Sequence, residues 1–202
     1  MGVGVLLFVG WTLWGTGLYT AREQDRLNEA FEKLPDIEVT PTTQDEIQVP
    51  SGFQPRPGEP VFRMRIPKID FRKMVVEGVG TEDLRRGPGH YPQCRPGFDR
   101  PLCTEFDEIW PGELGRVVVS GHRTTYGAPF WDLNKLQEGD EIITETKWGT
   151  FTYSVTSTET VSPGSLGIVI PSDNPEIVLT TCNPRFSAAE RLIVFAEMVE
   201  AA

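Results

Sequence analysis

From about residue 60 onward the chain carries a succession of short segments rich in Val, Ile, Thr and Phe, and this pattern constrains the fold most. Each segment is bounded by Gly, Pro, Asn or Asp, which favour turns. Only short helical pieces are expected between them, at 81–84 and 130–136. Many short strands without long helices predict an all-β domain, either a closed barrel or a sandwich. The predicted strands are 61–66, 73–79, 116–120, 141–146, 149–160, 176–181 and 191–199.

The charge of the chain excludes one class of partner. Its formal net charge is -10 at pH 7, whereas a protein that binds nucleic acid needs a basic face. The same charge argues against electrostatic adhesion to anionic lipid. It is compatible with a cationic partner, although a diffuse acidic surface is more often only solvated.

The N-terminal segment differs from the rest. Residues 2–19 contain no charged side chain, and a helix of that length reaches roughly 27 Å, close to the hydrocarbon thickness of a bilayer. No basic residue precedes the apolar run and no clear cleavage site follows it, so an uncleaved anchor is favoured over a signal peptide. We therefore predict a transmembrane anchor at 1–20, an extracytoplasmic linker rich in Pro, Thr and Gln at 21–59, and a folded domain at 60–202 on the outer side of the cell membrane.

Three cysteines bear on the compartment. Cys94 and Cys103 flank a short loop that contains Pro and Gly, while Cys182 stands alone. One disulfide plus one free thiol indicates an oxidising, extracytoplasmic setting. Two free thiols, or a metal site, are the alternatives; two histidines and no Cys-x-x-Cys pair make the metal site the weakest of the three.

Three residues that end or begin predicted strands suggest acyl-transfer chemistry. Cys182 follows one apolar run, His122 follows another, and Arg191 opens a third. Such a reaction needs a thiol nucleophile, a proton donor for the leaving amine and a donor for the developing oxyanion. The plainer interpretations are a buried small cysteine, a loop histidine and a surface arginine.

The motifs around these residues resemble the sortases, membrane-anchored cysteine transpeptidases of Gram-positive bacteria. The family signature Thr-x-Thr-Cys, with an arginine shortly after it, corresponds to Leu179-Thr180-Thr181-Cys182 and Arg191. The family histidine lies in a Gly-His pair after an apolar strand, here Gly121-His122. Further stretches that resemble the class E group of actinobacteria are 65–69, 87–92 and 120–130.

The resemblance implies an eight-stranded sortase-type β-barrel and a two-step reaction. Cys182 would cleave a sorting signal between Thr and Gly and form a thioacyl enzyme. His122 would protonate the departing amine, and Arg191 would orient the substrate and stabilise the oxyanion. The implied partners are secreted proteins with a C-terminal sorting signal, and a peptidoglycan precursor or stem-peptide amine as acceptor. No cofactor and no metal are predicted.

Two more residues receive roles from the resemblance. Thr181 would line the substrate groove, and Tyr126 matches a tyrosine linked to a Leu-Ala-x-Thr-Gly type of signal; its plainer interpretation is packing within a turn. Two other functions stay open. A pilin-polymerising sortase is disfavoured because no lid motif precedes the barrel, and a non-catalytic binding module is disfavoured by the intact Cys182, His122 and Arg191.

Three further features remain to be placed. His90, the second histidine, is interpreted as structural. Arg123 and Arg185 lie near the predicted site, but Arg191 opens the following strand and is preferred. The segment 93–115 is longer than the resemblance leads us to expect and is acidic. It is interpreted either as a disulfide-pinned flap beside the substrate groove or as a surface insertion.

Overall fold

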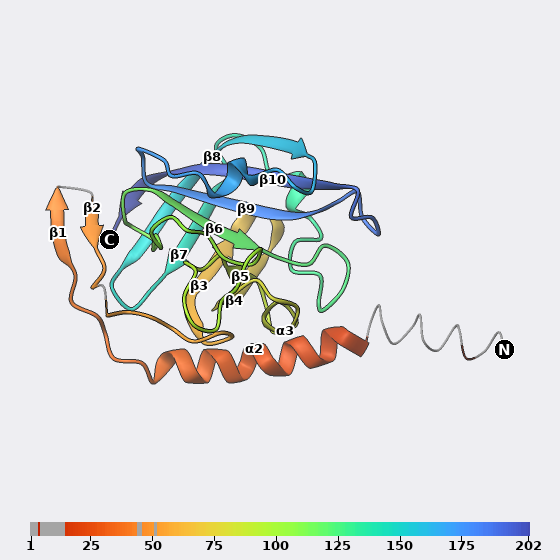
Figure 1. The fold of residues 1–202 in the computed structure, drawn as a ribbon, viewed down its shortest axis with the longest axis horizontal. Helices are drawn as coiled ribbons and strands as arrows, with labels where there is room; N and C mark the ends of the chain where they lie inside the picture. The colour runs from red at the N-terminus through yellow and green to blue at the C-terminus, as the bar shows by residue number, and fades with distance from the viewer. Residues whose placement is uncertain (1–3, 5–14, 44–45, 51) are drawn as a thin grey trace.

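The strands predicted from the sequence close into a barrel. The computed structural model describes residue 4 and residues 15–43, 46–50 and 52–202. Eight strands form the barrel in the order β10-β8-β7-β3-β4-β5-β6-β9, as Figure 1 shows. Their bounds are β3 Pro60–Ile66, β4 Phe71–Glu77, β5 Gly89–His90, β6 Arg116–Ser120, β7 Glu141–Glu145, β8 Thr150–Val161, β9 Glu176–Asn183 and β10 Glu190–Ala201. The expectation of a closed eight-stranded β-barrel is confirmed.

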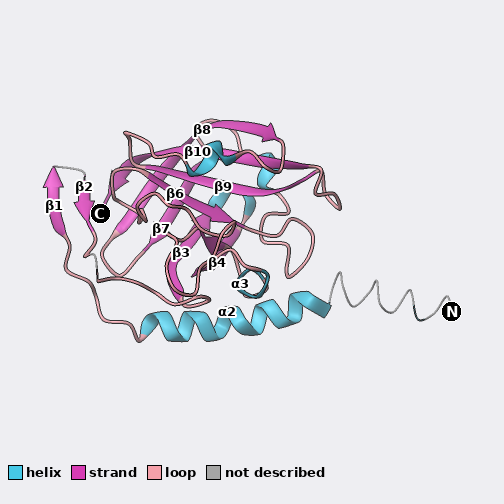
Figure 2. Cartoon of the chain, in the orientation of Figure 1, coloured by secondary structure: helices cyan, strands magenta, loops and turns pink. Residues whose placement is uncertain are grey.

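Helices are few among the described residues. One long helix, α2 (Thr16–Glu32), lies along the outside of the barrel, as Figure 2 shows. The remaining pieces are short: α3 Thr81–Leu84 and the 3-10 turns η2 Pro67–Ile69, η3 Leu133–Lys135 and η4 Leu166–Val169. A two-stranded hairpin of β1 (Thr40–Thr43) and β2 (Glu46–Gln48) stands apart from the barrel sheet.

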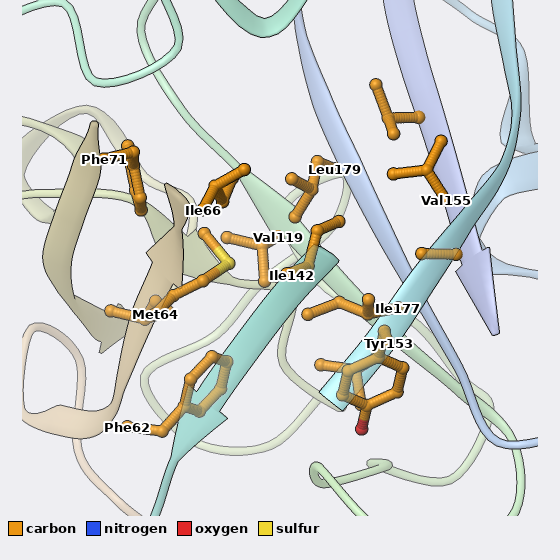
Figure 3. Packing of buried hydrophobic residues seen from close by; sticks show 14 of the residues in the cluster. Phe62, Met64, Ile66, Phe71, Val119, Ile142, Tyr153, Val155, Ile177 and Leu179 are labelled. Carbon is orange, nitrogen blue, oxygen red and sulfur yellow. The ribbon is translucent and has the colours of Figure 1, made fainter. Parts of the chain in front are cut away.

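Alternation along the strands fills the barrel. On β8, Phe151, Tyr153 and Val155 are buried while the residues between them are less so, as expected where one face of a strand is covered. Figure 3 shows side chains from β3, β7, β8 and β9 meeting in the interior. The labelled members of this core are Phe62, Met64, Ile66, Phe71, Val119, Ile142, Tyr153, Val155, Ile177 and Leu179.

Strand β9 is buried on both faces, which explains its continuous apolar run. Ile177 and Leu179 point into the barrel core. Val178 belongs to a second cluster with Val118 and Ile193, which η4 helps to cover. Because β9 is fixed on both sides, its end is a rigid place for a side chain that must react.

Strand β5 is the one barrel strand that the sequence does not predict. It contains only Gly89 and His90, and it pairs in parallel with β4 and antiparallel with β6. Two residues carry no periodicity, so only the neighbouring strands define this element.

The segment 21–59, predicted as a linker, contributes to the packing of the barrel domain. Leu27 and Phe31 of α2 are buried against Met74 and Val76 of β4. The side-chain amide of Gln24 is buried, donating from Nε2 to the Met74 oxygen at 3.0 Å and accepting from the Met74 nitrogen at 2.8 Å. A free linker would make no such buried contacts with the barrel. The helical spacing is visible in the sequence, but its partner strand is not.

The predicted membrane anchor at 1–20 falls mostly on residues 1–3 and 5–14, which lie outside the described residues. Within the part of the chain that the structure describes, no helix has both the length and the apolar character needed to cross a bilayer.

Candidate active site

Cys182 and Arg191 lie opposite each other on neighbouring strands. They are direct Cα partners in the antiparallel pair of β9 and β10. Side chains of directly opposed residues are close enough to interact. Cys182 is a free, partly buried thiol, so the hairpin places the thiol residue directly across from an arginine.

His122 is brought to the same end of the barrel by β6. Strand β6 runs parallel to β9, with Ser120 beside Thr180. Two hydrogen bonds continue this pairing past the strand end: Gly121 N–H donates to the Thr180 oxygen at 3.1 Å, and the Thr181 hydroxyl donates to the Gly121 oxygen at 2.7 Å. The residues just before Cys182 therefore hold the backbone just before His122.

Gly121 is required by close packing at this point. A Cβ atom built on it would lie 2.6 Å from the Phe130 ring. The backbone of Phe130 also donates to the His122 oxygen at 3.1 Å. The Gly-His pair thus lets the chain turn over a buried phenylalanine and deliver the imidazole.

The environment of His122 favours a neutral imidazole. Burial lowers the pKa of His122, and the nearby positive charge of Arg85 lowers it further. The Nε2 atom is buried and has no hydrogen-bond partner among the described residues. The Tyr126 ring packs against the imidazole, with ring centroids 5.1 Å apart and ring planes tilted by 35°. A neutral imidazole can accept a proton from a reacting group.

Arg123 and Arg185 support the backbone around the site. Arg123 is 5% exposed and donates to the Cys182 oxygen at 3.3 Å and the Trp131 oxygen at 3.1 Å. Arg185 also donates to the Trp131 oxygen, at 2.9 Å from Nη2, and its guanidinium group lies over the Trp131 ring. Arg191, by contrast, donates from Nη1 to nearby backbone oxygens, those of Ala188 at 3.1 Å and Glu190 at 3.0 Å.

Thr181 and Tyr126 differ in what they offer a substrate. Thr181 is 3% exposed and its hydroxyl is used to hold Gly121, so the structure gives it a supporting contact. Tyr126 is partly exposed beside His122, and its hydroxyl accepts a hydrogen bond from Arg85 Nε at 3.1 Å. The substrate-binding roles of both residues stay predictions.

His90 belongs to a buried ion-pair network. Its Nδ1 atom lies 2.8 Å from Glu77 Oε2, and its Nε2 atom lies 3.1 Å from the Ile109 oxygen. Arg95 pairs with Glu77 at 3.2 Å and with Glu108 at 2.6 Å. Burial raises the pKa of Glu77 to about 7 and lowers the pKa of His90 to about 4.

The same network contains the group of side chains best arranged to hold a metal ion among the described residues. One ligand atom each from Glu77, His90 and Glu108 lies within 4.8 Å of the others. However, the Arg95 guanidinium already bonds both carboxylates, and its positive charge opposes a cation at that point. The cluster is therefore an internal ion-pair network that ties residues 93–108 to the barrel.

Cys94 and Cys103 form a disulfide, with Cα atoms 4.9 Å apart. The insertion that carries it leaves the barrel after β5 and rejoins it at Arg116, the end of β6 remote from His122. It packs on the Glu77–His90 network, where Trp110 stacks on His90 at 4.5 Å between ring centroids. This placement favours the surface-insertion interpretation over a flap beside the substrate groove.

The sequence pattern did not predict two contacts of this region, those of Arg85 and Arg123. Arg85 and Arg123 are separated in sequence from the atoms that they contact, Tyr126 Oη and the Cys182 oxygen respectively. Neither arginine stands in a pattern that would predict its partner, and only the folded barrel brings each pair together.

A closed barrel that presents a thiol beside an arginine, next to a histidine loop, defines a cysteine enzyme of the acyl-transfer type. The Sortase domain family matches residues 64–199. Sortase SrtE1 of Streptomyces coelicolor is 33% identical over 98% of this chain, which spans 54% of the length of that relative. Sortase D of Bacillus subtilis is 29% identical over 98% of this chain and 93% of its own length. The chain belongs to the sortase family, whose members are cysteine transpeptidases.

Solved structures agree with this assignment. Sortase E1 of Streptomyces coelicolor, solved with a tripeptide in its active site, has a TM-score of 0.60 and 31% identity, covering 73% of this chain and 93% of its own. The Sortase D5 transpeptidase of Clostridium perfringens has a TM-score of 0.60 and 25% identity, covering 73% of this chain and 83% of its own.

Proposed function

We propose that this sortase cleaves a Leu-Ala-x-Thr-Gly-like sorting signal between Thr and Gly and transfers the protein to a peptidoglycan amine. The observation that carries the proposal is the register of β9 and β10, which pairs Cys182 with Arg191. The hydrogen bonds of Gly121 with Thr180 and Thr181 hold the loop of His122 beside them. These are the groups that a thiol-dependent acyl transfer needs.

In the first step, the neutral imidazole of His122 takes the proton of the Cys182 thiol, and the thiolate so formed attacks the carbonyl carbon of the substrate threonine. The guanidinium group of Arg191 stabilises the developing oxyanion, because it remains charged and offers several fixed donors. The carbon–nitrogen bond then breaks, and His122 gives a proton to the departing glycine amine. A thioester between the threonine carbonyl and Cys182 is left on the enzyme.

In the second step, an amine of the peptidoglycan precursor or stem peptide attacks the thioester. The neutral imidazole of His122 takes the proton of that amine, and the Cys182 thiolate leaves. The lowered pKa of His122 suits this second step, because a base must be unprotonated before it accepts the proton.

The position of Tyr126 beside His122 supports its proposed role in selecting the second residue of the signal. We also propose that the apolar segment 2–19 anchors the chain in the cell membrane, with the barrel on the outer side. The uncharged composition of that segment supports the anchor, and the Cys94–Cys103 disulfide supports the oxidising compartment.

Peptide cleavage tests the proposal. The full-length chain is incubated with quenched fluorescent peptides that contain Leu-Ala-x-Thr-Gly or Leu-Pro-x-Thr-Gly, with an amine acceptor present. We expect thiol-dependent cleavage between Thr and Gly, faster for the Ala peptide, and none by Cys182→Ala. If a folded wild-type protein cleaves neither peptide, another sorting motif or the binding-module function becomes the better account.

A further inference from the structure

The loop after His122 has an unusual backbone. Tyr126, Gly127 and Ala128 have consecutive positive φ angles of 52°, 72° and 44°. Two of these residues carry a Cβ atom, for which the left-handed region is unfavourable. Such a run persists only where neighbouring elements hold it in place.

The first turn of α2 supplies part of that support. The backbone N–H of Tyr126 donates to the Thr16 hydroxyl oxygen at 3.1 Å. A Cβ atom built on Gly17 would lie 3.8 Å from the Gly127 backbone, and one built on Gly127 would lie 3.7 Å from the Thr20 side chain. The helix therefore contacts the loop over several consecutive residues.

Arg85 supplies the remaining support for the loop. Its Nε atom donates to the Tyr126 hydroxyl at 3.1 Å, and its guanidinium carbon lies 5.5 Å from the centre of the Tyr126 ring. Arg85 is itself fixed, because Nη1 pairs with Glu82 at 2.6 Å and its backbone oxygen accepts from the Thr20 hydroxyl at 2.8 Å. Arg85, Tyr126 and His122 thus form a continuous series of contacts.

We propose that Arg85 is a positioning residue for His122, which it holds through Tyr126 with the first turn of α2 as a second support. The inference rests on the proposed role of His122 as the proton donor and acceptor. It assigns to the first turn of α2, which overlaps the end of the predicted anchor at 1–20, a direct contact with the catalytic loop. Sortase activity would then depend on this helix as well as on the barrel.

The charge of Arg85 gives the proposal an independent readout. After burial, Arg85 is the group that lowers the pKa of His122. Loss of the positive charge should therefore raise that pKa, whereas a merely structural residue would leave it unchanged. The other titratable and charged groups on the elements around the loop include Glu82, which pairs with Arg85, Tyr126, which accepts from Arg85, and Arg123, Cys182, Arg191, Asp132 and Arg185.

The first test is a proton titration that needs no catalysis. The chain has two histidines, so NMR signals of His122 and His90 can be followed separately in the full-length Cys182→Ala protein. Arg85→Gln is expected to raise the midpoint of His122 and to leave His90 unchanged. Arg85→Lys, which keeps the charge, should stay close to the parent. Arg72→Gln, which removes an exposed charge on β4, is the matched control. An unchanged His122 midpoint in a folded Arg85→Gln protein overturns the electrostatic part of the proposal.

The second test is a double-mutant cycle on kcat and KM for peptide cleavage. Arg85→Gln alone should lower kcat/KM by about tenfold, in line with the loss of a hydrogen bond to a charged group. In a Tyr126→Phe background the same change should have much less effect, because the shared contact is already gone. Fully additive effects would show that Arg85 does not act through Tyr126.

The two tests separate this inference from the proposed function. If wild type cleaves no peptide, the function fails while the titration still decides whether Arg85 controls His122. If Arg85→Gln does not fold, Arg85→Lys and Thr16→Val take its place in the cycle, because each removes one contact to Tyr126. Wild-type kcat/KM in both of these variants would also overturn the proposal.

Discussion

At the scale of single residues, the site depends on short hydrogen bonds between backbone segments that are distant in sequence. The Thr181 hydroxyl is the clearest case, since it links the strand of Cys182 to the residue before His122. Sequence resemblance assigns Thr181 to the substrate groove, but its side chain is buried. Its contact with Gly121 gives it a supporting role that can be tested separately.

Thr181→Val should lower kcat/KM by about tenfold, because a buried carbonyl loses its donor and the loop of His122 is released. Thr181→Ser keeps the hydroxyl and is the matched control, with activity near that of wild type. Steady-state cleavage of the sorting peptide measures both. Equal activity of the Val and Ser variants would rule out this contact as a determinant of the site.

Burial makes His90 a second residue-scale prediction. The unfolded chain binds a proton on His90 near pH 6.5 and the folded protein only near about 4. The stability contributed by neutral His90 is therefore present above pH 6.5 and is lost as the pH falls toward 4. Glu77 has the opposite pH dependence. The stability that protonated Glu77 contributes is present below pH 4.5 and is lost as the pH rises through about 7. NMR should show His90 neutral at pH 5, and a midpoint at or above 6.5 would contradict the buried network.

At the scale of elements, α2 is the part of the molecule whose role changes most between sequence and structure. Its apolar residues repeat at helical spacing, yet the sequence does not reveal that β4 covers them. Leu27 is 5% exposed and lies in a cluster with Phe31, Met74 and Val76. The helix is therefore expected to contribute to the stability of the barrel domain.

Leu27→Ala should lower the free energy of unfolding by about 2–3 kcal/mol, the usual cost of a buried leucine. Leu18→Ala on the same helix is the control, since Leu18 is 65% exposed and should change stability by less than about 0.5 kcal/mol. Urea denaturation measures the free energy of unfolding of both variants. Equal stabilities would show that α2 does not pack on the barrel in solution.

The disulfide of the insertion is the second prediction at this scale. Cys94 and Cys103 are separated by 9 positions, and closing so short a loop contributes about 2–3 kcal/mol on the chain-entropy model. The double substitution Cys94→Ser with Cys103→Ser should remove that stability in urea denaturation. Because the insertion joins the barrel away from His122, peptide selectivity should not change. Altered selectivity would support the flap interpretation instead.

At the scale of the whole molecule, local patterns predicted the barrel strands well because β-branched runs and turn residues mark them directly. The two-residue strand β5 escaped because it has no pattern of its own. Cys182, His122 and Arg191 were predicted as the site because each adjoins a strand end, and the structure brings their backbone positions to one end of the barrel. Arg85, the backbone contacts of Arg123 and the partners of α2 were not predicted, since these contacts depend on how distant elements pack.

The barrel, the thiol and the histidine loop together support one central claim, that Cys182 carries a thioacyl intermediate. The most direct measurement is intact-protein mass spectrometry of the full-length chain incubated with the Leu-Ala-x-Thr-Gly peptide without an amine acceptor. We predict an adduct on Cys182 with the mass of the peptide cut after its threonine, released when an amine is added and absent from Cys182→Ala. Peptide cleavage by Cys182→Ala at the wild-type rate, with no adduct on the wild type, would contradict the account.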